Sequence, residues 1–117
     1  MPHFIIDCSK NILQQESPEK ILHTVYECAE ASGLFATEGV GGIKVRINSY
    51  DEFLTVGTRD DFIHVFGNIM EGRTVEQKSS LSKSIVSTLK SMFPDVPIVS
   101  MNIREFEKST YANKSMV

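Results

Sequence analysis

Residues 62–78 read FIHVFGNIMEGRTVEQK, and this stretch holds a complete change from one type of secondary structure to another. Its first part, residues 62–70, is rich in β-branched and aromatic side chains, which is typical of a strand. Positions 71–73 (EGR) read as a turn. Thr74 and Gln77 then form a capping box, a pattern that begins helices. The stretch predicts a strand that leads through a turn into a helix.

The residues after this stretch predict the rest of that helix and one more strand. Apolar residues recur at helical spacing and define one stripe: Leu81, Ile85, Leu89 and Met92. Pro94 and Pro97 end the helix, because proline cannot donate a helical backbone hydrogen bond. Residues 98–106 alternate between apolar and polar side chains, which predicts a strand with one buried face.

The first half of the chain repeats this order. Residues 3–8 (HFIIDC) suit a strand that begins almost at the chain start. Residues 17–19 (SPE) supply an N-cap, a proline and an early acid for a helix, which Gly33 ends. Residues 43–50 alternate and predict a half-buried strand. The polar segment 51–61 then separates the two halves.

The order strand, helix, strand therefore occurs twice, and we expect an α+β fold. One domain spans residues 1–117, with a first repeat at about residues 2–50 and a second at about 61–107. Each repeat places its two strands in parallel, and the two repeats together form one four-stranded sheet with both helices on one face. The strands carry apolar side chains on both sides, such as Ile5 with Ile6 and Ile63 with Phe66, so a bare open face would expose an apolar patch. We expect oligomerisation through that face, the alternative being a two-layer monomer that binds a ligand there.

Composition excludes several classes of function. The 117 residues carry 12 basic and 15 acidic side chains, so the net charge is -3, and no basic cluster suits nucleic acid. No leader or 18-residue apolar run occurs, so we expect a cytoplasmic protein with no membrane partner. Cys8 and Cys28 read as reduced core residues. Because His3, His23 and His64 share no metal-ligand spacing, neither a metal nor a cofactor is expected.

Pro2 is the first candidate for chemistry. Removal of Met1 would expose a secondary amine, and a chain-terminal amine ordinarily has a pKa of about 8. In an apolar pocket beside cations that pKa falls, and the amine becomes a general base near neutral pH. The plainer alternative is that Pro2 only protects the start of the chain.

Three basic residues are candidates for anion binding. Arg73 lies where a strand turns into a helix and can grip a carboxylate with two parallel hydrogen bonds. Lys44 and Arg46 are neighbours on the polar face of a strand and repel each other unless an anion lies between them. The alternatives are a solvated loop arginine and a solvated sheet face. With no nucleophilic dyad and no nucleotide loop, the set favours proton transfer on an acidic small molecule.

Two segments resemble known enzymes. Residues 69–78 (IMEGRTVEQK), with the following helix and strand to Phe106, resemble 4-oxalocrotonate tautomerase. The opening residues 1–9 (MPHFIIDCS), with Asn11-Ile12 behind them, closely resemble the start of 5-carboxymethyl-2-hydroxymuconate isomerase. That double-length family is related to macrophage migration inhibitory factor, and the resemblance spans nearly the whole chain.

The resemblance implies a homotrimer in which Pro2 is the catalytic acid/base near a subunit boundary and Arg73 binds a substrate carboxylate. The family's Gly-Ile-Arg-x-Arg segment reads GIKVR at residues 42–46, so Lys44 replaces the first arginine and Arg46 is the candidate to take over its role. Tyr111 falls near the aromatic residue that lines the tautomerase pocket. The glycine-rich loop 37–42 is expected to reshape one pocket wall.

The implied activity is a cofactor-free isomerisation in aromatic compound catabolism. A 2-hydroxy-dienoate, a dicarboxylate like 5-carboxymethyl-2-hydroxymuconate, would become its 2-oxo-enoate. Two alternatives remain: a non-catalytic trimeric binding protein on the same scaffold, and a keto-enol tautomerase of the phenylpyruvate type. A retained Met1 favours the binding protein, because it makes the Pro2 nitrogen an amide.

Overall fold

The computed structural model describes residues 1–39 and 41–117. Its four strands form one sheet in the order β2-β1-β3-β4. The strands are β1 (His3–Ser9), β2 (Lys44–Tyr50), β3 (Phe62–Met70) and β4 (Ile98–Phe106). The helices are α1 (Ile12–Gln15), α2 (Pro18–Ala31) and α3 (Val75–Met92), followed by the 3-10 turns η1 (Lys108–Thr110) and η2 (Lys114–Met116).

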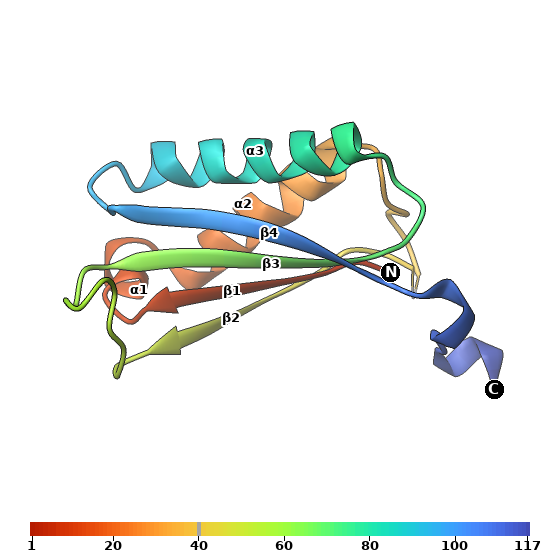
Figure 1. Ribbon diagram of the computed structural model, residues 1–117, viewed down its shortest axis with the longest axis horizontal. Coiled ribbons are helices and arrows are strands. Elements are labelled where there is room, and N and C mark those ends of the chain that lie inside the picture. Colours follow the sequence, from red (N-terminus) through yellow and green to blue (C-terminus); the bar gives the residue numbers. More distant parts are fainter. Residues whose placement is uncertain (40) are drawn as a thin grey trace.

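Both predicted strand-helix-strand units are present. Strands β1 and β2 pair in parallel around α2, and β3 and β4 pair in parallel around α3. The units join through an antiparallel pairing of β1 with β3, which makes these the two central strands. Helices α2 and α3 lie side by side over the same face of the sheet, as expected (Figure 1).

The helix termini follow the sequence signals. The Ser17 side chain accepts a hydrogen bond from the backbone of Lys20 at 3.2 Å, and Gly33, just beyond the end of α2, has a φ of 71°. Thr74 and Gln77 form both hydrogen bonds of the capping box, at 3.1 and 2.9 Å. Because the box fixes the first turn of α3, it also fixes the turn that precedes it. The short helix α1 and the two 3-10 turns were not predicted.

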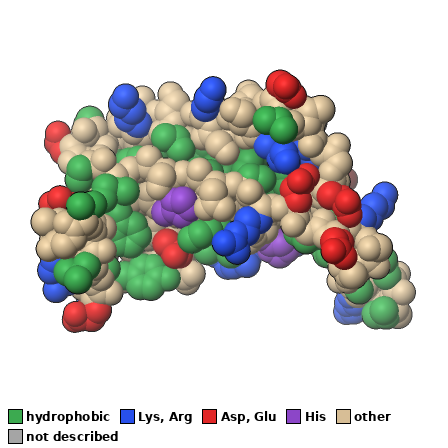
Figure 2. Space-filling view, viewed as in Figure 1, with side chains coloured by type: hydrophobic (Ala, Val, Ile, Leu, Met, Phe, Trp, Pro, Cys, Tyr) green, Lys and Arg blue, Asp and Glu red, His purple; other side chains and the backbone are tan. Residues whose placement is uncertain are grey.

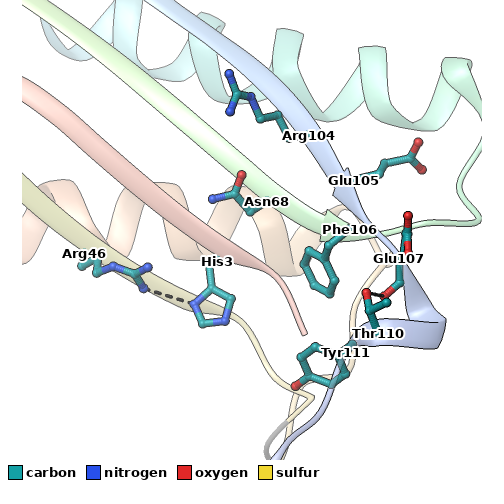
Figure 3. Close-up of a pocket in the computed structure, with 9 residues that line it drawn as sticks. All are labelled: His3, Arg46, Asn68, Arg104, Glu105, Phe106, Glu107, Thr110 and Tyr111. Carbon is teal, nitrogen blue, oxygen red and sulfur yellow. Dashed lines mark hydrogen bonds between the residues drawn. The ribbon is translucent and has the colours of Figure 1, made fainter.

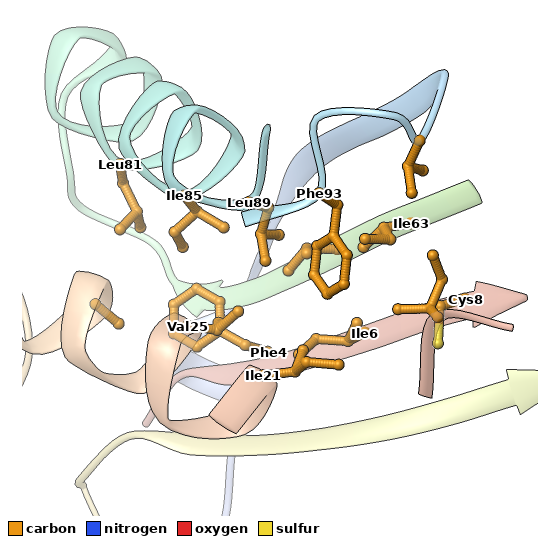
Figure 4. Close-up of a cluster of buried hydrophobic side chains, with 14 of the residues drawn as sticks. Phe4, Ile6, Cys8, Ile21, Val25, Ile63, Leu81, Ile85, Leu89 and Phe93 are labelled. Carbon is orange, nitrogen blue, oxygen red and sulfur yellow. The ribbon is translucent and has the colours of Figure 1, made fainter. Parts of the chain in front are cut away.

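The hydrophobic core lies between the helices and the covered face of the sheet (Figure 4). Alternate residues of the central strands point into it, and the helix stripes close it from above. The buried residues of α2 are Ile21, Val25 and Ala29, and those of α3 are Leu81, Ile85 and Leu89. Cys8 is fully buried, and burial together with Asp7 raises its pKa to about 11. Cys8 is thus a packing residue, while Cys28 is a free cysteine that is only half-buried.

The open face of the sheet is more polar than the sequence predicted. The register aligns three rows of side chains across all four strands: Lys44, His3, Asn68 and Arg104; then Arg46, Ile5, Phe66 and Asn102; then Asn48, Asp7, His64 and Ser100. In one view of the surface, charged and histidine side chains are interspersed with hydrophobic ones along the strands (Figure 2). Within residues 1–39 and 41–117, none of the helices has the length and apolarity that crossing a membrane requires.

Replacing Leu89 with alanine should destabilise the protein, because Leu89 is fully buried in the core. A cavity left by this truncation costs about 2–5 kcal/mol. Lys90→Ala, at the exposed neighbouring position, should change the free energy of unfolding by no more than about 0.5 kcal/mol. Urea denaturation of both variants checks this, and equal stabilities would contradict the described packing.

Candidate active site

The start of the chain lies in the middle of the sheet, because β1 is a central strand. Pro2 is buried, and its carbonyl accepts a hydrogen bond from the backbone of Lys44 at 3.1 Å. This parallel pairing brings Lys44 beside the chain start, where its ammonium lies 3.2 Å from Met1 Sδ. The same ammonium donates to the carbonyl of Gly42 at 2.8 Å.

Arg73 approaches the chain start from β3, which runs beside β1. Its guanidinium donates to the carbonyls of Met70 at 3.1 Å and Leu34 at 2.7 Å, and it lies 5.0 Å from the centroid of the Phe35 ring. A guanidinium has five N–H donors, so these contacts orient it without using all of them. Arg73 is therefore a held, half-buried arginine, which favours the anion-binding interpretation over a solvated loop.

The structure thus brings Pro2, Lys44 and Arg73 together as a terminal group. Burial lowers the pKa of the Met1 amine, and the charges of Lys44 and Arg73 lower it further. While Met1 is attached, the Pro2 nitrogen is an amide and has no basic lone pair. Loss of Met1 moves the chain-terminal amine to Pro2, in the same basic surroundings.

A pocket of about 560 Å³ lies on the open face beside the terminal group. His3, Arg46, Asn68 and Arg104 line it from four strands, and Phe106 and Tyr111 line its other side (Figure 3). We refer to these six residues as the sheet-face pocket. Arg46 and Tyr111 therefore share one pocket, whereas Lys44 and Arg73 belong to the terminal group. The expected site residues divide into two neighbouring sets.

His3 connects the two sets. Burial lowers its pKa, and so do the nearby charges of Arg46, Lys44 and the chain-terminal amine. His3 Nδ1 lies 3.1 Å from the Arg46 guanidinium, which can only donate, so Nδ1 is the acceptor. The proton of the neutral ring is then on Nε2, and three basic groups, Arg46, Lys44 and the chain-terminal amine, act on this ring through their charges. Such a concentration of positive charge suits an anionic ligand.

Sequence reasoning missed His3, Asn68 and Arg104 as parts of a site. Each lies on a predicted strand, but alternation marks a polar face only for Arg104, which shares it with Asn102. What the sequence lacks is the register that aligns residues from opposite ends of the chain. In loop 37–42 the carbonyl of Gly42 accepts a hydrogen bond from Lys44, and position 40 lies outside the described residues. The expected reshaping of a pocket wall by this loop stays a prediction.

Comparison with known proteins agrees with this geometry. The family model for 5-carboxymethyl-2-hydroxymuconate isomerase matches residues 2–117. The chain belongs to this family. It is also 26% identical over 95 residues to the 5-carboxymethyl-2-hydroxymuconate Delta-isomerase of Escherichia coli, a match that covers 80% of this chain and 73% of the relative. The chain is accordingly a tautomerase-type isomerase.

Solved structures share the fold. A 5-carboxymethyl-2-hydroxymuconate isomerase from Deinococcus radiodurans R1 matches with a TM-score of 0.79 at 24% identity, over 97% of this chain and 88% of that one. A "fused 4-OT wild type symmetric trimer" matches with a TM-score of 0.74 at 11% identity, over 98% and 96%. The macrophage migration inhibitory factor of Trichinella spiralis matches with a TM-score of 0.70 at 10% identity, over 96% of each chain. The expected α+β fold is confirmed.

Replacing Lys44 with glutamine should raise the pKa of the chain-terminal amine, because a cation that disfavours the protonated amine is lost. The pH dependence of acylation at that amine, followed by mass spectrometry of the first peptide, measures the change. Lys90→Gln, on the far helix, is the matched control and should leave this pKa unchanged. A pKa that is unaltered in the Lys44 variant would contradict the described coupling.

Proposed function

We propose that this isomerase converts a 2-hydroxy-dienoate to its 2-oxo-enoate without a cofactor, with Pro2 as the acid/base once Met1 is removed. The observation that carries the proposal is the position of the buried chain start beside Lys44 and Arg73, whose charges lower the pKa of the chain-terminal amine. A lower pKa leaves more of the amine unprotonated near neutral pH, and one pKa unit changes the ratio of the two forms tenfold. Pro2 can then act as a base without a preceding activation step.

The reaction needs one proton to leave oxygen and one to arrive at carbon. The Pro2 nitrogen accepts the proton of the 2-hydroxyl group, and the electron pair left behind spreads over the dienolate to C3 and C5. Protonated Pro2 then returns a proton to one of these carbons, so the C2–oxygen bond becomes a carbonyl and Pro2 is regenerated. No other redox or group-transfer partner is required.

The two cations of the terminal group take different parts. Arg73 is oriented by Met70, Leu34 and Phe35, and its remaining donors hold a substrate carboxylate. Lys44 lies beside the chain-terminal amine and stabilises the negative charge that develops on the 2-oxygen. Lysine supplies this charge without the planar fork of an arginine, so it acts at a single oxygen.

The family supports the choice of substrate class. A 2-hydroxymuconate has a carboxylate at each end, and a 5-carboxymethyl group adds a third. We propose 5-carboxymethyl-2-hydroxymuconate as the substrate, which has one carboxylate more than the dicarboxylate expected from the sequence. Such a molecule places this enzyme in aromatic compound catabolism.

An ultraviolet assay with 5-carboxymethyl-2-hydroxymuconate and 2-hydroxymuconate tests the proposal. Protein whose intact mass shows loss of Met1 should turn over the substrate, and protein that retains Met1 should be inactive. Arg73→Ala should lower kcat/KM by about 10²-fold or more, because it removes an oriented charged donor. Melting temperatures of the variants control for folding.

No turnover of either compound by the processed enzyme would overturn the isomerase proposal. It would favour the non-catalytic binding protein, for which the lysine at position 44 is the argument. Turnover of phenylpyruvate in preference to both muconates would favour the third alternative. Unchanged kinetics of the Arg73 variant would refute the role given to that residue.

We also propose that the protein is a homotrimer that associates through the open face of the sheet around Phe66, with the sheet-face pocket left accessible at the chain-start end of the strands. Phe66 is half-buried on this face, and two of the related folds are described as symmetric trimers. Light scattering should give the mass of three 13.1-kDa chains. Phe66→Asp should lower that mass, whereas Leu54→Asp, at a residue 76% exposed in the loop between β2 and β3, should not. A monomeric wild-type protein would contradict the proposal.

A further inference from the structure

We propose that the sheet-face pocket binds the third carboxylate of the substrate, the one on the carboxymethyl group, and that Arg104 and Arg46 select substrates that carry it. This inference rests on the proposed function, because it assigns one part of the same substrate. It adds Arg104 and His3 to the residues that contact the ligand.

The sheet register assembles the pocket from parts of the chain that are far apart. His3 pairs with Asn68, and Asn68 pairs with Arg104, so the three side chains form a row on the open face. Arg46 reaches the same place from β2 and bonds to His3 at 3.1 Å. Two guanidinium groups thus approach one pocket from the two edges of the sheet.

The groups around the pocket are mainly donors. Guanidinium groups donate only, the neutral His3 ring offers its Nε2–H, and the Asn68 amide has two N–H donors. Of the two glutamates on the lining, Glu105 accepts from Lys78 at 3.1 Å, and Glu107 lies beyond Phe106 from His3 (Figure 3). A carboxylate is the small organic group that accepts from several such donors at once.

An aromatic wall accompanies these donors. Tyr111 stacks on Phe106 with the ring centroids 5.5 Å apart and an angle of 29° between the planes. A flat apolar surface of this kind suits the unsaturated carbon chain of a dienoate, while the arginines hold its charged end. A volume of about 560 Å³ is within the ordinary range for small-molecule sites.

The position of His3 lets one ligand occupy the terminal group and the sheet-face pocket together. His3 follows Pro2 directly, and its pKa responds to the chain-terminal amine and to Lys44 on one side and to Arg46 on the other. A substrate with three carboxylates needs more cationic contacts than Lys44 and Arg73 provide. The pocket supplies the missing contact next to the proposed base.

Kinetics with two substrates test the inference. Arg104→Gln and Arg46→Gln should raise KM for 5-carboxymethyl-2-hydroxymuconate about tenfold or more, as expected for the loss of a charged hydrogen bond, and leave its kcat nearly unchanged. KM for 2-hydroxymuconate, which lacks the third carboxylate, should change less than about twofold. Arg59→Gln removes the same charge at the opposite end of the sheet and should change neither KM.

Calorimetric titration with unreactive acids separates the two proposals. The wild-type protein should bind butane-1,2,4-tricarboxylate more tightly than adipate, and Arg104→Gln should abolish this preference. In one outcome the wild-type protein shows the Arg104-dependent preference and still turns over neither muconate. That result supports the pocket as a carboxylate-binding site and contradicts the isomerase proposal. If Arg104→Gln weakens both acids equally, or neither of them, the pocket assignment is overturned whatever the turnover. Light scattering and melting temperatures show whether a variant retains its assembly and fold.

Discussion

The antiparallel pairing of β1 with β3 is the constraint on which the rest of the structure depends. It makes the first strand of the chain a central strand, so the chain start has a neighbour on each side. Lys44 comes from β2 on one side, and Arg73 follows β3 on the other. If β1 were an edge strand, the amine would be near only one of these cations. One of the two charges that lower its pKa would then be lost.

An excess of positive charge around the chain-terminal amine and His3 is the second feature that defines the site. The groups that lower the pKa of the chain-terminal amine and of His3 are basic neighbours and burial, and no acidic group opposes them among the causes. Such a cluster is unfavourable in the unliganded protein and becomes favourable when an anion is bound. The repulsion among these charges lowers the stability of the folded protein and favours the binding of an anion at one end of the sheet. The hydrophobic core on the other face of the sheet offsets the lost stability.

Lys44 lies where the family resemblance predicts an arginine, and this difference changes how the cationic group is oriented. Lys44 Nζ is held by the Gly42 carbonyl at 2.8 Å, so a backbone group takes over the orientation that a planar guanidinium would provide itself. Arg46 does not substitute for it in the terminal group, because the Arg46 guanidinium contacts the His3 ring at 3.1 Å and not the chain start. It contributes to the sheet-face pocket instead.

The sequence by itself determined the local structure: the four strands, the two long helices, the capping box at Thr74 and the alternating faces of the strands at residues 43–50 and 98–106. These features depend on residues close together in the chain, so periodicity and capping patterns reveal them. It also singled out Pro2 and Arg73 as candidates, from their positions at the chain start and at the turn between a strand and a helix. Only the tertiary structure decided the strand order, the separation of Lys44 from Arg46, and the meeting of Arg104 with His3. These depend on register between strands up to about a hundred residues apart, which hydrogen bonding and packing of the whole sheet fix and no local pattern encodes.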